Sequence, residues 1–281
     1  MQNVRLYPAA LTIAGSDSGG GAGIQADLRT FHYFRVFGTS AITAVTFQNP
    51  LEVAGIEPVS PEGVRAQIRT VRKGIDIAAV KTGMLFSAEI IEAAADALSG
   101  FTGPLVVDPV MISTSGRNLL REDAVEALKN TLLPKAAWIT PNLPEAEALT
   151  GRRIQSGDDA VQAARECAAR WKCSVVLKGG HADGPEAADV VFHEGVSLLL
   201  STPRIPVKGN SDHGTGCTFS AALTALLAQG TGWKDALIRA KAFVLASLTH
   251  PVRLSVCGVY GMYPPTETLT QFSQRIHCKE L

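Results

Sequence analysis

The sequence has no excess of charge of either sign, because its 26 lysines and arginines balance 26 aspartates and glutamates. We therefore do not expect a basic surface of the kind that binds nucleic acid or an anionic membrane. No apolar run reaches 18 residues, and the first eight residues lack the charged-then-apolar pattern of a secretion signal. These absences predict a cytoplasmic protein whose partners are small molecules, with neither nucleic acid nor a membrane among them.

Cysteine is also scarce, with five in 281 residues and none in the short paired spacing of a zinc site. The nearest pair, Cys167 and Cys173, matches no zinc pattern, so we expect free thiols. The G-x-x-x-x-G-K-[ST] motif of P-loop proteins is missing, which excludes that route to ATP binding.

Apolar residues make up 46% of the chain, enough for a sizeable core. No linker or repeat divides it, so we expect one domain over residues 1–281.

Short β-rich runs alternate with longer helical patterns along the chain. This alternation is typical of an α/β fold with a mostly parallel central sheet and helices on both faces. The segments 189–193 and 196–200 predict a hairpin that gives the sheet an antiparallel edge. The expected strands are 11–14, 39–46, 76–81, 104–107, 136–140 and 174–177, and the expected helices are 24–33, 124–132, 156–171, 214–229, 233–248 and 267–276, with two more beginning at residues 60 and 87.

A glycine-containing turn at residues 211–217 precedes the apolar run that we expect to form the 214–229 helix. Gly214 and Gly216 let the backbone approach a ligand closely, and the first N–H groups of a helix have no partner within it. The stretch therefore predicts a phosphate site. An ordinary loop before a core helix stays open as the alternative from these residues alone.

Polar residues follow most of the expected strands, at the edge where ligands bind in open α/β sheets. Each one taken singly is equally well explained as a turn former or a helix cap. Together with the 214–217 loop they form a candidate site: Asp17, Gln48, Lys81, Asp108, Asn142, Glu145 and Lys178.

Two other patterns near the N-terminus do not fit the rest of the sequence. Residues 21–26 match the G-x-G-x-x-A dinucleotide pattern, but the next strand ends at Gln48 without an acid to hold a ribose. Residues 17–20 are similar to the nucleophile loop of chymotrypsin-like proteases, which are all-β proteins. Neither a dehydrogenase nor a serine protease is therefore expected.

Seven motifs occur in the order found in hydroxymethylpyrimidine/phosphomethylpyrimidine kinases, which are ribokinase-like enzymes of the thiamine pathway. The motifs lie at residues 14–27, 43–49, 81–85, 107–111, 140–146, 178–181 and 213–218. The resemblance extends from about residue 9 to about residue 250 and implies a ribokinase-like fold. It also implies ATP-dependent, Mg²⁺-dependent phosphorylation of 4-amino-5-hydroxymethyl-2-methylpyrimidine, then of its monophosphate, by a homodimer.

Two alternatives to this activity stay open. Pyridoxal and pyridoxine kinases share the Gly-Thr-Gly-Cys loop and also phosphorylate a hydroxymethyl group on a six-membered heteroaromatic ring. The second alternative is a non-catalytic pyrimidine-binding protein of the same fold, which Phe47 and Asp212 motivate. The family often has a small residue where Phe47 stands, and Asp212 adds a negative charge beside the phosphate site. The tail 251–281 matches no family motif.

On the phosphate side, the resemblance implies a catalytic role for Gly214, Gly216, Lys178 and Cys217. The loop would form the anion hole, and Cys217 would accept the proton of the substrate hydroxyl, helped by the lowered pKa expected of a thiol at a helix N-terminus. Lys178, Asn142, Thr215 and Gly216 would bind the nucleotide. Asp108 and the Glu145 of Asn142-x-x-Glu145 would hold Mg²⁺.

On the acceptor side, the resemblance implies that Gln48 binds the edge of the aminopyrimidine, for which its amide offers both a donor and an acceptor. Met84 and Met111 would cover the faces of the ring. Gly15, Ala22 and Asp27 complete the expected acceptor site.

Overall fold

The computed structural model describes residues 7–111, 119–121, 123–180 and 184–281, and one ten-stranded sheet runs through this part of the chain. Its strands are β1 (Ala9–Asp17), β2 (Phe37–Asn49), β3 (Glu52–Pro58), β4 (Ile77–Thr82), β5 (Leu105–Val107), β6 (Trp138–Ile139), β7 (Ser174–Lys178), β8 (Glu186–His193), β9 (Val196–Pro203) and β12 (His277–Glu280). They are ordered β12-β9-β8-β7-β6-β5-β4-β1-β2-β3. A separate two-stranded sheet joins β10 (Val252–Arg253) to β11 (Tyr260–Gly261).

The central strands pair in parallel from β2 through β1, β4, β5 and β6 to β7. The hairpin β8–β9 adds antiparallel strands beside β7, so the expected mostly parallel sheet with an antiparallel edge is confirmed. The opposite edge is also antiparallel, because β3 turns back along β2. The sequence analysis does not contain β3, whose exposed side chains do not alternate with buried ones.

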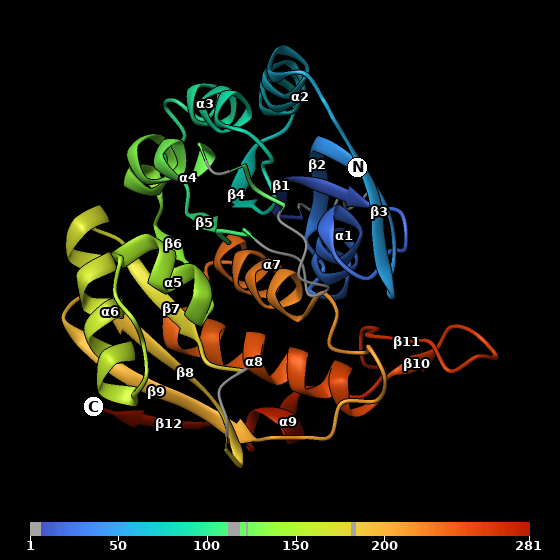
Figure 1. Cartoon of the computed structure of the whole chain (residues 1–281), viewed down its shortest axis with the longest axis vertical. Helices are drawn as coiled ribbons and strands as arrows, with labels where there is room; N and C mark the ends of the chain where they lie inside the picture. Colours follow the sequence, from blue (N-terminus) through green and yellow to red (C-terminus); the bar gives the residue numbers. More distant parts are fainter. Residues whose placement is uncertain (1–6, 112–118, 122, 181–183) are drawn as a thin grey trace, which may run out of the picture.

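Helices cover both faces of the sheet. They are α1 (Gly23–Tyr33), α2 (Pro61–Gly74), α3 (Ala88–Ala97), α4 (Ala124–Ala127), α5 (Leu143–Thr150), α6 (Gly157–Trp171), α7 (Thr215–Ala228), α8 (Trp233–Thr249) and α9 (Thr270–Ser273), with a π-turn at Leu128–Leu132 and a 3-10 turn at Leu133–Lys135. One hydrophobic cluster packs α2, α3, α4, α5 and α6 on one face, and a second packs α1, α7, α8 and α9 on the other. Figure 1 shows α7 and α8, in orange, side by side near the centre of the molecule.

Three helices begin where their capping residues predict. The hydroxyl of Ser60 accepts a hydrogen bond from the Gly63 N–H with Pro61 in the first turn, and Ser87 caps α3 through the Ile90 N–H. Ser156 and Asp159 form a reciprocal capping box at the start of α6. Each such cap stabilises its helix by about 1 kcal/mol.

Helix α7 is buried on nearly all sides, which places its N-terminus inside the molecule. Every residue from Thr218 to Leu226 is buried, because α1 and α8 cover the sides of the helix that do not face the sheet. An all-round apolar helix is stable only in such surroundings. Its first turn therefore lies at the carboxyl ends of the central strands.

The prediction of a helix over residues 267–276 is wrong for most of that range. Helix α9 is a single turn, and the chain continues as β12, which pairs antiparallel with β9. Leu269, Phe272 and Ile276 have helical spacing and do pack in the second hydrophobic cluster. The chain enters β12 directly after Ile276, so the apolar residues pack against the second cluster from a single helical turn and the segment after it.

Within the described residues, no helix combines the length and the apolar composition needed to cross a bilayer.

Candidate active site

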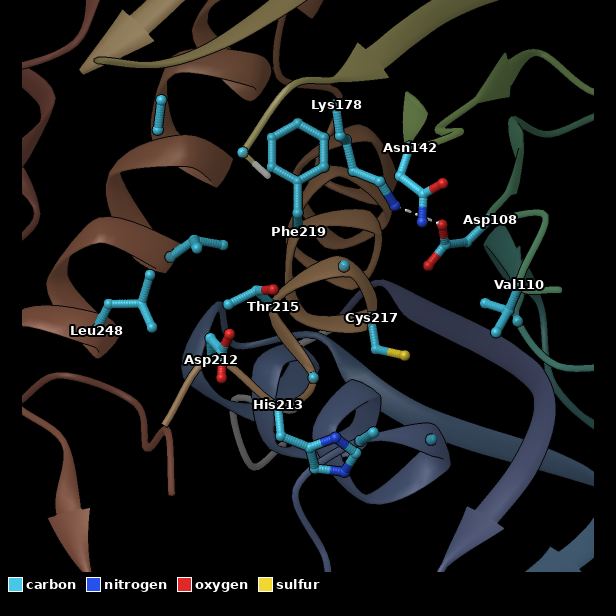
Figure 2. Close-up of a pocket in the computed structure, with 18 of the residues that line it drawn as sticks. Asp108, Val110, Asn142, Lys178, Asp212, His213, Thr215, Cys217, Phe219 and Leu248 are labelled. Carbon is cyan, nitrogen blue, oxygen red and sulfur yellow. Dashed lines mark hydrogen bonds and ion pairs between the residues drawn. The ribbon is translucent and has the colours of Figure 1, made fainter. Parts of the chain in front are cut away.

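A cavity of about 400 Å³ lies where the carboxyl ends of β1, β4 and β7 meet the N-terminus of α7. Thirteen of the expected site residues line it: Gly15, Ala22, Gln48, Lys81, Met84, Asp108, Asn142, Glu145, Lys178, Gly214, Thr215, Gly216 and Cys217. Figure 2 shows Lys178 and Asp108 to one side of the first turn of α7, with Cys217 projecting toward that side. The last residue of the 178–181 motif, His181, lies outside the described residues.

Two residues expected at the acceptor site do not line this cavity. Asp27 is completely buried beneath it, with both carboxylate oxygens 2.8 Å from Lys81 Nζ. The hydroxyl of Thr12 donates a further bond of 2.6 Å to Asp27. Met111 is buried in the first hydrophobic cluster. Both residues therefore support the site from behind its surface.

Asp17 also lies outside the cavity lining, where it holds the glycine loop 18–22 in place. Its buried carboxylate accepts hydrogen bonds from the N–H groups of Gly19 (2.8 Å) and Ala22 (2.7 Å) and lies 3.2 Å from His213 Nε2. Burial opposes ionisation of Asp17, but the bond from His213 and the backbone bonds outweigh it and lower its pKa. The glycine loop is thereby fastened to the loop that precedes α7.

The loop at 214–217 has the conformation that the glycines predict. Gly214 has φ +86°, a left-handed conformation, and a Cβ atom there would overlap the carbonyl oxygen of Gly21. A Cβ atom at Gly216 would lie 3.1 Å from Lys178 Nζ. No described residue accepts a hydrogen bond from the backbone N–H of Gly216 or Cys217. These two N–H groups are therefore available to an anion, beside a lysine ammonium.

Lys178 and Asp108 form an ion pair next to this loop, with Nζ and Oδ1 2.8 Å apart. Thr140 donates to the same carboxylate at 3.0 Å and Ser220 at 3.2 Å. Burial disfavours both charges, yet Asp108 and Glu145 raise the pKa of Lys178, and Lys178 lowers the pKa of Asp108. The pair is therefore charged at neutral pH.

Asn142 and Glu145 form a capping box at the start of α5. The Glu145 N–H donates to Asn142 Oδ1 at 2.9 Å, and the Asn142 N–H donates to Glu145 Oε2 at 2.8 Å. The spacing Asn-x-x-Glu before a helix is a signal for this structure that the sequence analysis did not use. Asn142 also lies beside Lys178 through a parallel β-bridge. Burial raises the pKa of Glu145 to about 7, although Lys178 opposes the rise.

The acid residues suit one kind of metal site. Among the described residues, no three His, Cys, Asp or Glu side chains gather as a metal cage. Mg²⁺ usually takes only one or two protein carboxylates and completes its coordination with water and substrate phosphates. Asp108 and Glu145, which repel each other and both line the cavity, fit that mode.

The prediction that the helix N-terminus lowers the pKa of Cys217 is wrong. Burial raises the pKa of this thiol to about 11, and the carboxylates of Asp27 and Asp108 act in the same direction. Lys81 and a hydrogen bond from the Gly23 N–H oppose the rise without cancelling it. Burial and neighbouring acids thus outweigh the effect of the helix N-terminus, and Cys217 is a neutral thiol at pH 7.

The acceptor side of the cavity presents few charges. The Gln48 side-chain amide has no hydrogen bond to any described residue, while its backbone is held by Ser18. Met84 packs against Gly15, where a Cβ atom would lie 3.3 Å from the methionine sulfur. Phe47 does not narrow the cavity, because its half-exposed ring lies over Gly55 of β3. Asp212 lines the cavity and forms no ion pair with a described residue.

The part of the cavity lined by β9, the segment after it and α8 contains residues that the sequence analysis missed. Its lining is mostly apolar, from Ile205, Val244, Leu245 and Leu248, and Figure 2 shows Leu248 on the side opposite Asp108. A buried ion pair between Asp189 and Lys241 lies here, and the hydroxyl of Thr202 is buried without a partner among the described residues. The sequence did contain a signal for this ion pair, because Lys241 lies on the otherwise apolar face of the helix expected at 233–248.

Comparison with known proteins agrees with this arrangement. A family model described as phosphomethylpyrimidine kinase matches residues 17–261. A Haemophilus influenzae protein named hydroxymethylpyrimidine/phosphomethylpyrimidine kinase is 48% identical over 259 residues, which cover 90% of this chain and 94% of that protein. A Clostridium difficile phosphomethylpyrimidine kinase superposes with a TM-score of 0.74 at 41% identity, covering 84% of this chain and 97% of its own.

A second kind of kinase is also similar. A Staphylococcus aureus pyridoxal kinase in complex with AMP-PCP superposes with a TM-score of 0.86 at 33% identity, covering 99% of this chain and 100% of its own. These matches confirm the ribokinase-like fold that the resemblance implies. The residues matched by the family model include the 214–217 loop and the Lys178–Asp108 pair. The chain therefore belongs to the phosphomethylpyrimidine kinase family.

Proposed function

We propose that this protein transfers the γ-phosphoryl group of ATP to the hydroxymethyl group of 4-amino-5-hydroxymethyl-2-methylpyrimidine, and then phosphorylates the monophosphate, in thiamine biosynthesis. Membership of the family supports this activity. One structural observation carries it: the N–H groups of Gly216 and Cys217, for which no described residue is a hydrogen-bond acceptor, lie beside the Lys178 ammonium. The weakly charged acceptor side of the same cavity begins at Gln48 and Met84.

The donor side would hold the transferring phosphoryl group. The Gly216 and Cys217 N–H groups and Lys178 would meet the charge on its oxygens, which catalysis of phosphoryl transfer chiefly requires. Lys178 and Gly216 would also bind the phosphates that remain in ADP, and Asn142 and Thr215 would complete the nucleotide contacts. Asp108 and Glu145 would hold Mg²⁺, which when bound neutralises charge on the phosphates.

We assign the proton acceptor to Cys217. The substrate oxygen forms a bond to phosphorus, the bond to the leaving ADP oxygen breaks, and the hydroxyl proton passes to Sγ. Because burial raises the pKa of Cys217 to about 11, only its minor thiolate form accepts the proton at neutral pH. A loose transition state asks for little help from a base, so a small thiolate population suffices.

Gln48 and Met84 would bind the pyrimidine ring at its edge and face, against the open backbone of Gly15 and Ala22. Asp27 would act on this site through Lys81, and Met111 would support it from the core. The exposed apolar side chains Phe47 and Leu51, on and beside the edge hairpin β2–β3, support a homodimer. We further propose that residues 1–281 form one domain and work in the cytoplasm, where ATP is available.

Pyridoxal phosphorylation is the second candidate, because the likeness to the pyridoxal kinase extends over 99% of this chain. Incubating the purified protein with MgATP and either alcohol, then counting the phosphates added by mass spectrometry, decides between them. We expect the pyrimidine mono- and diphosphate. Product from pyridoxal alone would reverse the assignment, and pyrimidine binding without ATP turnover would indicate a non-catalytic protein.

A further inference from the structure

A buried ion pair between β8 and α8 lines the cavity and has no part in the mechanism proposed for the transfer. Lys241 Nζ of α8 lies 2.6 Å from Asp189 Oδ2 of β8, and each side chain is less than one-tenth exposed. Both residues line the cavity. Two charges are costly to bury, and such a pair by itself seldom adds net stability. Stability alone therefore does not account for the pair.

Asp189 is tied to the segment that carries the phosphate-side lysine. Its second oxygen, Oδ1, accepts a hydrogen bond of 3.1 Å from the Gly179 N–H, directly after Lys178. A Cβ atom at Gly179 would overlap the carbonyl oxygen of Ala188, so the two strands are in close contact here. The carboxylate thus fixes the peptide that follows Lys178.

Asp189 is also the direct cross-strand partner of Lys178 in the antiparallel pair β7–β8. Side chains opposite each other in such a pair share one face, with Cβ atoms about 5 Å apart. A lysine side chain spans that separation easily. Asp189 therefore lies within reach of the Lys178 ammonium and can compete with Asp108 for it.

We propose that Lys241 is a positioning residue for Lys178. By neutralising Asp189, it prevents that carboxylate from attracting the Lys178 ammonium, which stays with Asp108 beside the 214–217 loop. The four side chains then form two ion pairs, each without net charge. The N–O distance is 2.8 Å between Lys178 and Asp108 and 2.6 Å between Lys241 and Asp189. This inference rests on the proposed function only for its kinetic readout, since nucleotide affinity tests it without turnover.

The two members of the pair should respond differently to substitution. Lys241→Met leaves a buried, unpaired carboxylate opposite Lys178, so Lys178 turns toward it and the phosphate contact is lost. Asp189→Asn removes the competing charge and keeps an oxygen to accept the Gly179 N–H bond. The double variant Lys241→Met/Asp189→Asn is neutral and also keeps that acceptor. A pair needed only for folding would give no such asymmetry.

The experiment measures ADP affinity by calorimetry, together with kcat, the KM values for ATP and the pyrimidine alcohol, and the thermal midpoint. Lys234→Met, at an exposed position of the same helix, is the matched control. We expect Lys241→Met to weaken ADP binding and raise the KM for ATP by about tenfold or more, the scale of a lost charged contact. The KM for the alcohol should stay unchanged. Asp189→Asn and the double variant should stay within about threefold of wild type, an effect under 1 kcal/mol.

An equal loss in Lys241→Met and the double variant would overturn the inference in favour of direct contact between Lys241 and the nucleotide. Unchanged ADP affinity in Lys241→Met would overturn it as well. If Lys241→Met fails to fold, near-normal ADP binding by the double variant supports the inference and a tenfold loss there contradicts it. A wild-type protein that binds ADP but phosphorylates no alcohol would refute the proposed function and would leave the role of Lys241 untouched.

Discussion

Lys81 Nζ lies 2.8 Å from both carboxylate oxygens of Asp27, and neither side chain is exposed. Burial opposes the charge of Lys81, but the Asp27 carboxylate outweighs it and raises the pKa of the lysine. A positive charge is thus held beneath Cys217. The pair joins β4 to α1, with Lys81 in the cavity lining and Asp27 beneath it.

Asp27→Asn should therefore destabilise the protein. Removing one member leaves a buried ammonium without its counter-charge, which costs about 3–5 kcal/mol. Urea unfolding followed by circular dichroism measures the loss. Asp96→Asn, which removes an exposed partner of Arg65 and Arg69, is the control and should change little. A small effect at Asp27 would show that Lys81 loses its charge or finds another partner.

Gly214→Ala should strongly lower kcat for phosphoryl transfer. The substitution forces a Cβ atom into the Gly21 carbonyl at a left-handed position, which displaces the N–H groups of the 214–217 loop. Loss of such donors typically costs about 100-fold or more in kcat. Gly230→Ala is the matched control, because Gly230 also has positive φ but has open space around its Cβ position. Comparable kcat values for the two variants would argue against the loop as the anion site.

Activity should rise with pH if Cys217 accepts the proton as a thiolate. Because its pKa is raised to about 11, the ionised fraction grows about tenfold per pH unit below that value. We expect log kcat at saturating substrates to climb between pH 7 and 9, and Cys217→Ala to lose both most of kcat and this slope. Cys257→Ala, at an exposed thiol, should keep them. An equally active Cys217→Ala variant would remove Cys217 as the base.

Gln48→Ala should chiefly raise the KM for the pyrimidine alcohol. The lost amide contact is worth about 1 kcal/mol, or roughly fivefold, and the KM for ATP should not change. Phe47→Ala, at the neighbouring residue whose ring lies over β3, should leave both KM values unaltered. Steady-state kinetics with each substrate varied in turn makes the comparison. If the KM for the alcohol is unaffected, Gln48 lies outside the substrate contacts.

The alternation of strand and helix patterns predicts the parallel centre of the sheet, because buried parallel strands and their capped helices carry strong local signals. The same holds for the glycine loop, since Gly214 needs a conformation that other residues avoid. The pairing of β12 with β9 and the burial of Asp27 are not predictable in this way. They depend on contacts between distant segments, as does the rise in the pKa of Cys217.

The Gly214 backbone touches the Gly21 carbonyl, so the loop on the acceptor side of the cavity is in direct contact with the loop on the phosphate side. The glycine loop 18–22, which borders the acceptor, cannot shift without pressing on the donor loop. An alcohol that orders the first loop thereby also orders the second. Each substrate should then bind more tightly in the presence of the other, and by thermodynamic reciprocity the two enhancements should be equal.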